Sequence, residues 1–248
     1  MSAPVLRPLS AGEVLDVSFG VYRAHFVPLV TIAAMTRVVP DSLGIYVERS
    51  GGLLENIPLG ATHLLLSFVL STIGIAATTS VVSEAYLGGT VRAVDAIRDA
   101  FGFIGRLLVS SIGSAMLIVT GFILLIIPGF IAMSGLMLSS VVVVLEDKPG
   151  IDALQRSWDL SKGFRRKILS VIGITMLLLV VPTMLVGAML AIRAGSTEPG
   201  IPMMVATSIL SIFVYPFVYV ATVVLYYDIR VRKEGFDLEL MAADVPAT

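Results

Sequence analysis

The sequence predicts an all-α polytopic membrane protein whose six transmembrane helices form three hairpins, each preceded by a short interfacial amphipathic helix. Apolar residues make up 56% of the 248 residues and charged residues only 14%, whereas soluble domains carry about 45–50% and about 25%. The mean hydropathy is +0.95, and several stretches of 25 residues or more contain no charge. This composition excludes an ordinary soluble enzyme, a nucleic-acid-binding protein and a disordered chain.

Charge-free stretches locate the spans, because a membrane-crossing helix needs about 20 apolar residues. The longest stretch, 107–145, would measure about 58 Å as one helix, about twice the hydrocarbon thickness. It must therefore fold back, and Pro128 with Gly129 marks the expected turn. The predicted spans are 26–47, 60–83, 107–127, 130–146, 168–192 and 201–227. Residues 1–227 thus form a single integral membrane domain, and 228–248 are expected to form a short cytoplasmic tail.

The first span is the least regular. Arg37, Pro40 and Asp41 interrupt its apolar run. We expect a broken or kinked helix that crosses the membrane. The alternative is a re-entrant segment that returns to its own side, which would change the topology of everything after it.

Basic residues set the expected orientation. With six alternating spans, 14 of the 17 Lys and Arg residues fall on one side, two fall on the other, and Arg37 lies within a span. Loops on the cytoplasmic side of a membrane carry an excess of Lys and Arg. This distribution therefore predicts that both termini are cytoplasmic.

A short pattern recurs before each predicted hairpin. The segments Glu13–Phe19, Asp95–Phe101 and Asp152–Trp158 each begin with an acid and end with an aromatic residue. Each also has an aliphatic third residue and a small sixth residue. The apolar residues fall on one helical face, as in helices that lie in the headgroup plane. Ser10 and Glu13 fit a capping box, so the first of these helices should begin near Ser10.

Arg37 is the one basic residue inside a predicted span, where a charge costs roughly 2.5–3.5 kcal/mol on insertion scales. It could pair with Asp41, which lies four residues later on the same helical face. The alternative is that Arg37 lies near the outer interface and extends its charge into the headgroup region. The sequence alone favours that second interpretation.

Other charged residues lie at the cytoplasmic ends of spans. Glu84, Glu146 and Asp228 follow the second, fourth and sixth spans. They could converge on one another or on a cation, or pair with nearby basic residues, and we favour the pairing. A juxtamembrane basic cluster is expected to contact anionic lipid headgroups; it consists of Lys162, Arg165, Arg166 and Lys167.

Catalytic and cofactor motifs are missing from the sequence. It has no cysteine, two histidines, and no P-loop, HExxH, GxSxG or dinucleotide-binding pattern. We therefore expect no cofactor, no metal site and no enzymatic activity.

Three segments carry a resemblance to a known family. They are LRPLSAGEVLDVSFGVYRAHF, VVVVLEDKPGIDALQRSWDLSKG and the most specific one, LYYDIRVRKEGFDLELM. They resemble the membrane domain of bacterial glycerophosphoryl diester phosphodiesterases. The resemblance implies a protein of the bacterial cytoplasmic membrane and a link to glycerophospholipid metabolism. It implies no hydrolase activity, because that chemistry belongs to a separate TIM barrel of about 250 residues, which the predicted tail is too short to hold.

Three functions remain open on the sequence alone. The preferred one is a non-enzymatic scaffold or regulatory partner, the second a transporter or lipid-handling permease, and the third an enzyme acting on phospholipid headgroups. Membrane lipids are expected partners, together with another protein or a second copy of the chain, but not nucleic acid. A polar cavity at mid-depth would favour the transporter, and a sealed bundle would argue against it.

Overall fold

A computed structural model describes residues 7–89, 92–195 and 200–236. Within these ranges the chain forms nine helices and no strand. They are α1 (Ala11–Ala24), α2 (Phe26–Arg49), α3 (Ile57–Tyr86), α4 (Ala93–Leu124), α5 (Ile126–Leu136), α6 (Ser139–Leu145), α7 (Gly150–Ser161), α8 (Arg165–Ala194) and α9 (Ile201–Glu234).

Among the described residues, six helical segments are long and apolar enough to cross a membrane, which confirms the predicted fold class. They are α2, α3, α4, the α5–α6 segment Ile126–Leu145, the segment Arg165–Arg193 of α8, and α9. Each spans at least 20 residues, or about 30 Å of helix, which matches the hydrocarbon thickness.

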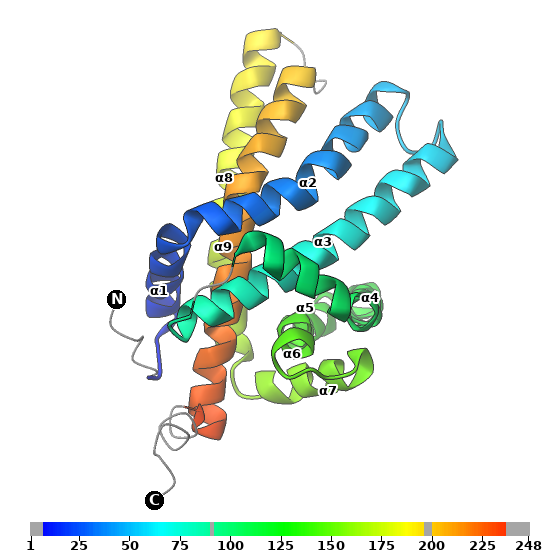
Figure 1. Cartoon of the computed structure of the whole chain (residues 1–248). Helices are drawn as coiled ribbons and strands as arrows, with labels where there is room; N and C mark the ends of the chain where they lie inside the picture. The colour runs from blue at the N-terminus through cyan, green and yellow to red at the C-terminus, as the bar shows by residue number, and fades with distance from the viewer. Residues whose placement is uncertain (1–6, 90–91, 196–199, 237–248) are drawn as a thin grey trace, which may run out of the picture.

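Two long hairpins dominate the shape of the molecule. In Figure 1 the α8–α9 hairpin is vertical, and the α2–α3 hairpin crosses it obliquely. Helices α4 to α7 lie beside α3 and the C-terminal half of α9. The turn between α2 and α3 lies at the same end as the C-terminal end of α8 and the N-terminal end of α9, and we call this the far end. We call the opposite end, where α1, α7 and the C-terminal end of α9 lie, the basic end.

The first span is one continuous helix despite its polar interruptions. Helix α2 runs unbroken from Phe26 to Arg49, with Pro40 inside it. A continuous helix of 24 residues does not turn back within its own length, so the expected break and the re-entrant alternative are both absent from α2.

The predicted interfacial helices take two forms. Helix α1 begins at Ser10 with the predicted capping box, in which Ser10 and Glu13 bond each other's backbone N–H. Helix α7 is also separate. The middle amphipathic segment instead continues into its span as one helix, α4, because no proline lies between Ala93 and Leu124.

The turn between α4 and α5 lies three residues earlier than expected. Leu125, with extended backbone, is the only residue between the two helices. Pro128 is the third residue of α5, where a missing N–H breaks no helical hydrogen bond. Gly121 permits the close packing of the two helices, since a Cβ added there would lie 3.0 Å from the Gly129 Cα. The fourth span is then divided at Met137 and Leu138 into α5 and α6.

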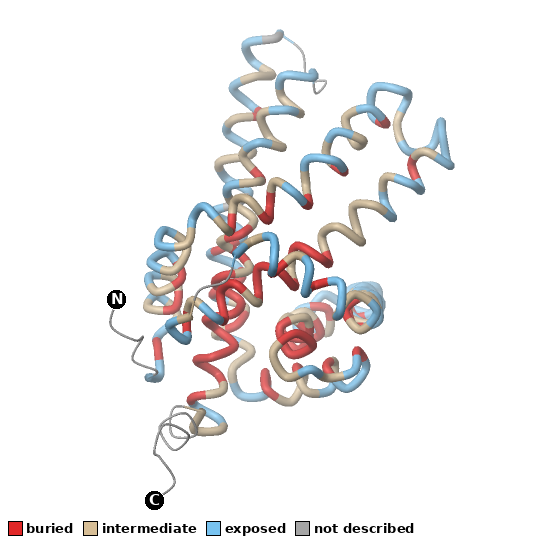
Figure 2. The backbone as a smooth tube through the Cα atoms, in the orientation of Figure 1, coloured by how far each residue is buried: buried red, intermediate tan, exposed pale blue. Residues whose placement is uncertain are grey.

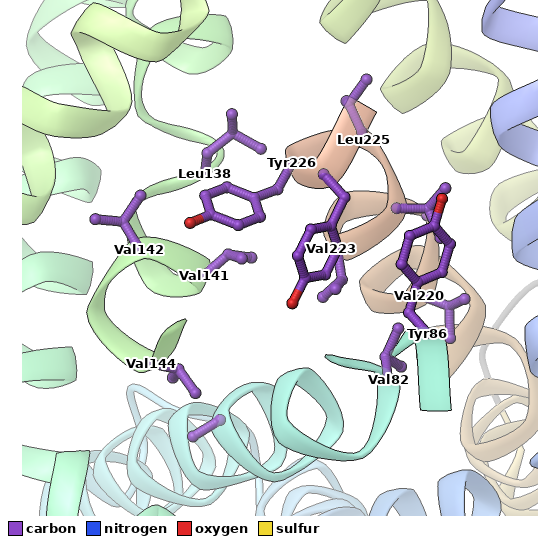
Figure 3. Close-up of a cluster of buried hydrophobic side chains, with 14 of the residues drawn as sticks. Val82, Tyr86, Leu138, Val141, Val142, Val144, Val220, Val223, Leu225 and Tyr226 are labelled. Carbon is purple, nitrogen blue, oxygen red and sulfur yellow. The ribbon is translucent and has the colours of Figure 1, made fainter. Parts of the chain in front are cut away.

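The buried core lies toward the basic end. Figure 2 shows buried residues concentrated in the C-terminal half of α9 and in neighbouring parts of α3 and α6. Figure 3 shows Val82 and Tyr86 of α3, Val141 and Val142 of α6 and Tyr226 of α9 meeting in this core. The outer halves of the long hairpins carry exposed apolar side chains, as a surface facing lipid requires.

Candidate functional site

Arg37 lies at the middle of the length of α2. It is the twelfth of the 24 residues of the helix, so it lies roughly 17 Å from either end. Its guanidinium turns toward α9, where Nε donates to the Ser211 hydroxyl at 3.2 Å. The guanidinium carbon also lies 4.3 Å from the centroid of the Tyr215 ring. The interpretation that we favoured from the sequence, with Arg37 extended into the headgroup region, is therefore wrong.

Asp41 pairs with Arg37, as their spacing allowed. Nη2 of Arg37 donates to Oδ1 of Asp41 at 3.3 Å, which is long for a charged hydrogen bond. The other carboxylate oxygen, Oδ2, is buried and accepts no hydrogen bond from any described residue. A buried acceptor without a donor costs about 1–3 kcal/mol. The pair is thus only half satisfied by the protein.

The Arg37 cavity, a polar space of about 230 Å³, lies against this ion pair. Helices α2, α8 and α9 form its walls. Hydroxyl groups from α8 and α9 line most of it, and Val214 is the one apolar residue in the lining. The residues are Arg37, Asp41, Thr183, Thr207, Ser208, Ser211, Val214 and Tyr215. A cation, a carboxylate and five hydroxyl side chains therefore share one space inside the membrane-spanning region.

The α2–α9 groove, an apolar space of about 150 Å³, adjoins the Arg37 cavity. The two spaces share Asp41 and Ser208. The other lining residues are Val38, Ser42, Ile45, Val205, Ile209 and Ile212. Half of the Val38 and Ile209 side-chain surface is exposed, so the groove opens to the side of the bundle.

Two smaller spaces continue from Arg37 toward the basic end. A cavity of about 20 Å³, room for about one water molecule, lies between Arg37, Ser71, Thr78 and Tyr219. Helices α2 and α3 approach closely there, because a Cβ added at Gly74 would lie 2.9 Å from the Thr36 hydroxyl. Beyond Tyr219 a cavity of about 130 Å³ is lined by hydroxyl and apolar side chains, namely Ile75, Thr79, Met137, Ser140, Val141, Tyr219 and Thr222.

Asp228 is the centre of a buried ion cluster at the basic end. Its side chain has no exposed surface and forms ion pairs with Lys167 and Arg232. Asp228 Oδ1 also accepts a hydrogen bond of 2.6 Å from the Leu9 N–H. The Leu9 carbonyl accepts from Lys167 and Arg232. This cluster ties the segment before α1 to both helices of the α8–α9 hairpin.

Glu146 belongs to a second cluster. Arg156 on α7 donates to Glu146 at 2.8 Å and to Glu234 at the end of α9, also at 2.8 Å. Glu146 accepts a further hydrogen bond of 3.0 Å from the Tyr226 hydroxyl. Hydrogen bonds to Glu234, and to a smaller extent to Glu146, raise the pKa of Arg156 further above its ordinary value. The cluster therefore joins α7 to α9 through a permanently charged residue.

The three acids at the ends of spans do not converge. Glu146 and Asp228 pair with basic residues in separate clusters, and Glu84 is exposed and joins neither of them. Across the described ranges, no three acidic or histidine side chains lie close enough to hold a metal ion.

The basic cluster that follows α7 is divided. Lys162 is exposed and pairs with Asp159 at 2.8 Å, and Arg166 is also exposed. Arg165 stacks on Trp158, with its guanidinium carbon 4.4 Å from the ring centroid. Lys167 is mostly buried and points at Asp228 and the Leu9 carbonyl. Lys167 must therefore be removed from the set expected to contact lipid headgroups.

The hydroxyl residues of the Arg37 cavity were not identified as site residues from the sequence. Thr207, Ser208, Ser211 and Tyr215 recur at helical spacing within an apolar run, which is a visible but weak signal. No protein-family model, no curated protein and no solved structure matches the chain.

Proposed function

We propose that this chain is a membrane protein that binds the anionic group of a ligand at Arg37 and thereby handles or transports that ligand. This is the second of the functions considered from the sequence, and it replaces the scaffold as our first choice. One observation carries the proposal. A charged side chain at mid-height in a span faces a polar cavity of about 230 Å³ whose walls are mostly hydroxyl groups.

The cost of burying a charge supports a binding role. An arginine at the centre of a span costs roughly 2.5–3.5 kcal/mol on insertion scales, and such residues usually mark a ligand or ion pathway. Asp41 offsets part of this cost but reaches Arg37 through only one oxygen, at 3.3 Å. The remaining guanidinium donors make Arg37 suited to an incoming anion.

The chemistry of the walls favours phosphate or carboxylate groups. A guanidinium matches two oxygens of either group at once. The hydroxyls of Thr207 and Ser211 also line this space, but they donate to backbone carbonyls of α9, so Arg37 is the main donor to the ligand. The Tyr215 ring stacks on the guanidinium and restricts its orientation.

The orientation and the wider role form part of the same proposal. The uneven distribution of Lys and Arg supports a cytoplasmic location for the basic end. The resemblance to the membrane domain of bacterial glycerophosphoryl diester phosphodiesterases supports a place in the bacterial cytoplasmic membrane and a link to glycerophospholipids. No enzymatic step is proposed.

A scaffold remains the second candidate because of one specific surface. Helices α1, α4 and α7 expose apolar side chains on their amphipathic faces, including Phe19, Phe101 and Ile151. Such a surface would suit either the headgroup layer of the membrane or a partner protein.

The proposed function is tested with a charged probe and an uncharged one. The protein in phosphatidylcholine nanodiscs is titrated with octyl phosphate and with octyl glucoside, and the midpoint of thermal unfolding is followed. Octyl phosphate should raise the midpoint, since a ligand that binds only the native state stabilises it. Octyl glucoside should not.

Arg37→Gln should abolish the response to octyl phosphate. Arg49→Gln is the matched control, because Arg49 ends the same helix and is exposed. An unchanged response in Arg37→Gln would contradict the proposed function.

A further inference from the structure

The position of the α2–α9 groove narrows the class of ligand that the Arg37 cavity accepts. We propose that the ligand is an anionic lipid whose headgroup binds in the Arg37 cavity while one hydrocarbon chain lies in the α2–α9 groove. This inference rests on the proposed function, because it adds a chain to the anion that Arg37 binds.

A shared border between the two spaces is the first argument. The polar cavity and the apolar groove share Asp41 on α2 and Ser208 on α9. On the far side of these two residues the lining changes from hydroxyl groups to Val38, Ile45, Val205, Ile209 and Ile212. An amphiphile changes from polar to apolar in the same way along its own length.

Helical spacing is the second argument. Val205, Ile209 and Ile212 recur at intervals of four and three along α9, and Val38 and Ile45 lie seven residues apart on α2. Seven residues span about 11 Å of helix. The groove is therefore an elongated strip between two helices, which suits a chain better than a compact solute.

Exposure is the third argument. Val38, Val205 and Ile209 are between 40% and 52% exposed, although each lies within a segment apolar enough to span the membrane. The groove thus opens sideways into hydrocarbon. A lipid that enters this way keeps its chain out of water. Its charged headgroup would be unfavourable in hydrocarbon, but here it contacts Arg37 and the hydroxyl groups.

A soluble anion is the rival occupant, and the same polar cavity could bind it. The experiment therefore compares inorganic phosphate with octyl phosphate, using the full chain in phosphatidylcholine nanodiscs and the dissociation constants from thermal-shift titrations. With both dissociation constants referred to the free ligand in water, the wild-type protein should bind octyl phosphate at least about tenfold more tightly than inorganic phosphate, a difference that removing roughly two methylene groups from water supplies.

Two variants fill the groove from opposite walls, Ile209→Trp on α9 and Val38→Trp on α2. Each should weaken octyl phosphate binding to the level of inorganic phosphate and leave inorganic phosphate binding unchanged. The control is Leu185→Trp, which adds the same ring at an exposed position on α8. It should bind both probes as the wild type does.

The outcomes separate the inference from the proposed function. Equal binding of the two probes by the wild type, or groove variants that bind octyl phosphate normally, would overturn the inference and leave an anion site at Arg37. Binding of inorganic phosphate that survives Arg37→Gln would overturn the proposed function itself.

Discussion

Asp41 directs one carboxylate oxygen at Arg37 and keeps the other buried without a hydrogen-bond donor among the described residues. It therefore uses one of the guanidinium donors that the proposed anionic ligand would need. If Arg37 binds an anion as proposed, Asp41 competes with that ligand for the guanidinium.

Asp41→Asn should accordingly strengthen the binding of octyl phosphate. The neutral side chain keeps the size of aspartate but leaves the Arg37 charge uncompensated. We expect affinity to rise about tenfold, which corresponds to about 1.4 kcal/mol. Thermal-shift titration measures the change, and Glu48→Gln, which removes an exposed acid of α2 outside both spaces, serves as the control. Weaker binding of octyl phosphate by Asp41→Asn would contradict this prediction. It would indicate that Asp41 holds the Arg37 side chain in its binding position.

Asp228→Asn should strongly destabilise the fold. Asp228 is fully buried, and its loss leaves the mostly buried Lys167 ammonium without its counter-ion. Removing one partner of a buried pair costs about 3–5 kcal/mol. The unfolding midpoint in denaturant would measure the loss, and Asp16→Asn at an exposed position of α1 should cause almost none.

The double variant Asp228→Asn with Lys167→Met separates charge from packing. It should recover part of the stability, because no unpaired charge is then buried. If the double variant is as unstable as the sum of the two single variants, the electrostatic explanation fails.

The helices were predictable because apolar length and the absence of charge are local properties of the chain. The Arg37–Asp41 pair was predictable for the same reason, since a spacing of four residues places both on one helical face. The contact of Arg37 with Ser211 and Tyr215 was not predictable. It depends on how two hairpins that are about 170 residues apart in the sequence cross each other. Periodicity defines the faces of a helix but not the partner of each face.

The basic end illustrates the same limit. The sequence identified Glu146 and Asp228 as acids near basic residues, and both do form ion pairs. Arg156 lies only ten residues from Glu146, but Lys167 and the backbone of Leu9 reach Asp228 from distant segments, so the identity of those two partners depends on tertiary packing. The turn at Leu125 was misplaced because proline is tolerated both in turns and in the first turn of a helix.

Glu13 should stay ionised in strong acid. A hydrogen bond from the Ser10 backbone N–H, assisted by Arg7, lowers the pKa of Glu13 from 4.5 to about 2. The stabilising contribution of the ionised carboxylate is complete above the ordinary pKa of 4.5 and is lost as the pH falls through about 2. Side-chain carboxyl NMR of the detergent-solubilised protein, with Glu13→Gln to assign the signal, measures this pKa directly.

Ser10→Ala should raise the pKa of Glu13 and loosen the start of α1. The Ser10 hydroxyl accepts from the Glu13 backbone N–H, and loss of such an N-cap costs about 1 kcal/mol. Ser42→Ala removes an exposed hydroxyl on α2 and is the control. A Glu13 pKa near 4.5 in the wild-type protein would contradict the capping-box explanation.

Cysteine labelling should distinguish the two ends of the bundle, and the chain has no native cysteine to interfere. Ser50→Cys lies in the exposed turn after α2, whereas Lys162→Cys lies at the exposed C-terminal end of α7; the neighbouring Ser161 is buried and unsuitable. In intact cells a membrane-impermeant maleimide should label Ser50→Cys at once and Lys162→Cys only after the membrane is opened. Rapid labelling of Lys162→Cys in intact cells would reverse the proposed orientation, since the basic end would then face outward.

Leu125→Cys, in a turn flanked by the apolar residues Leu124 and Ile126, should react more slowly than Ser50→Cys, because thiolate formation is suppressed in apolar surroundings.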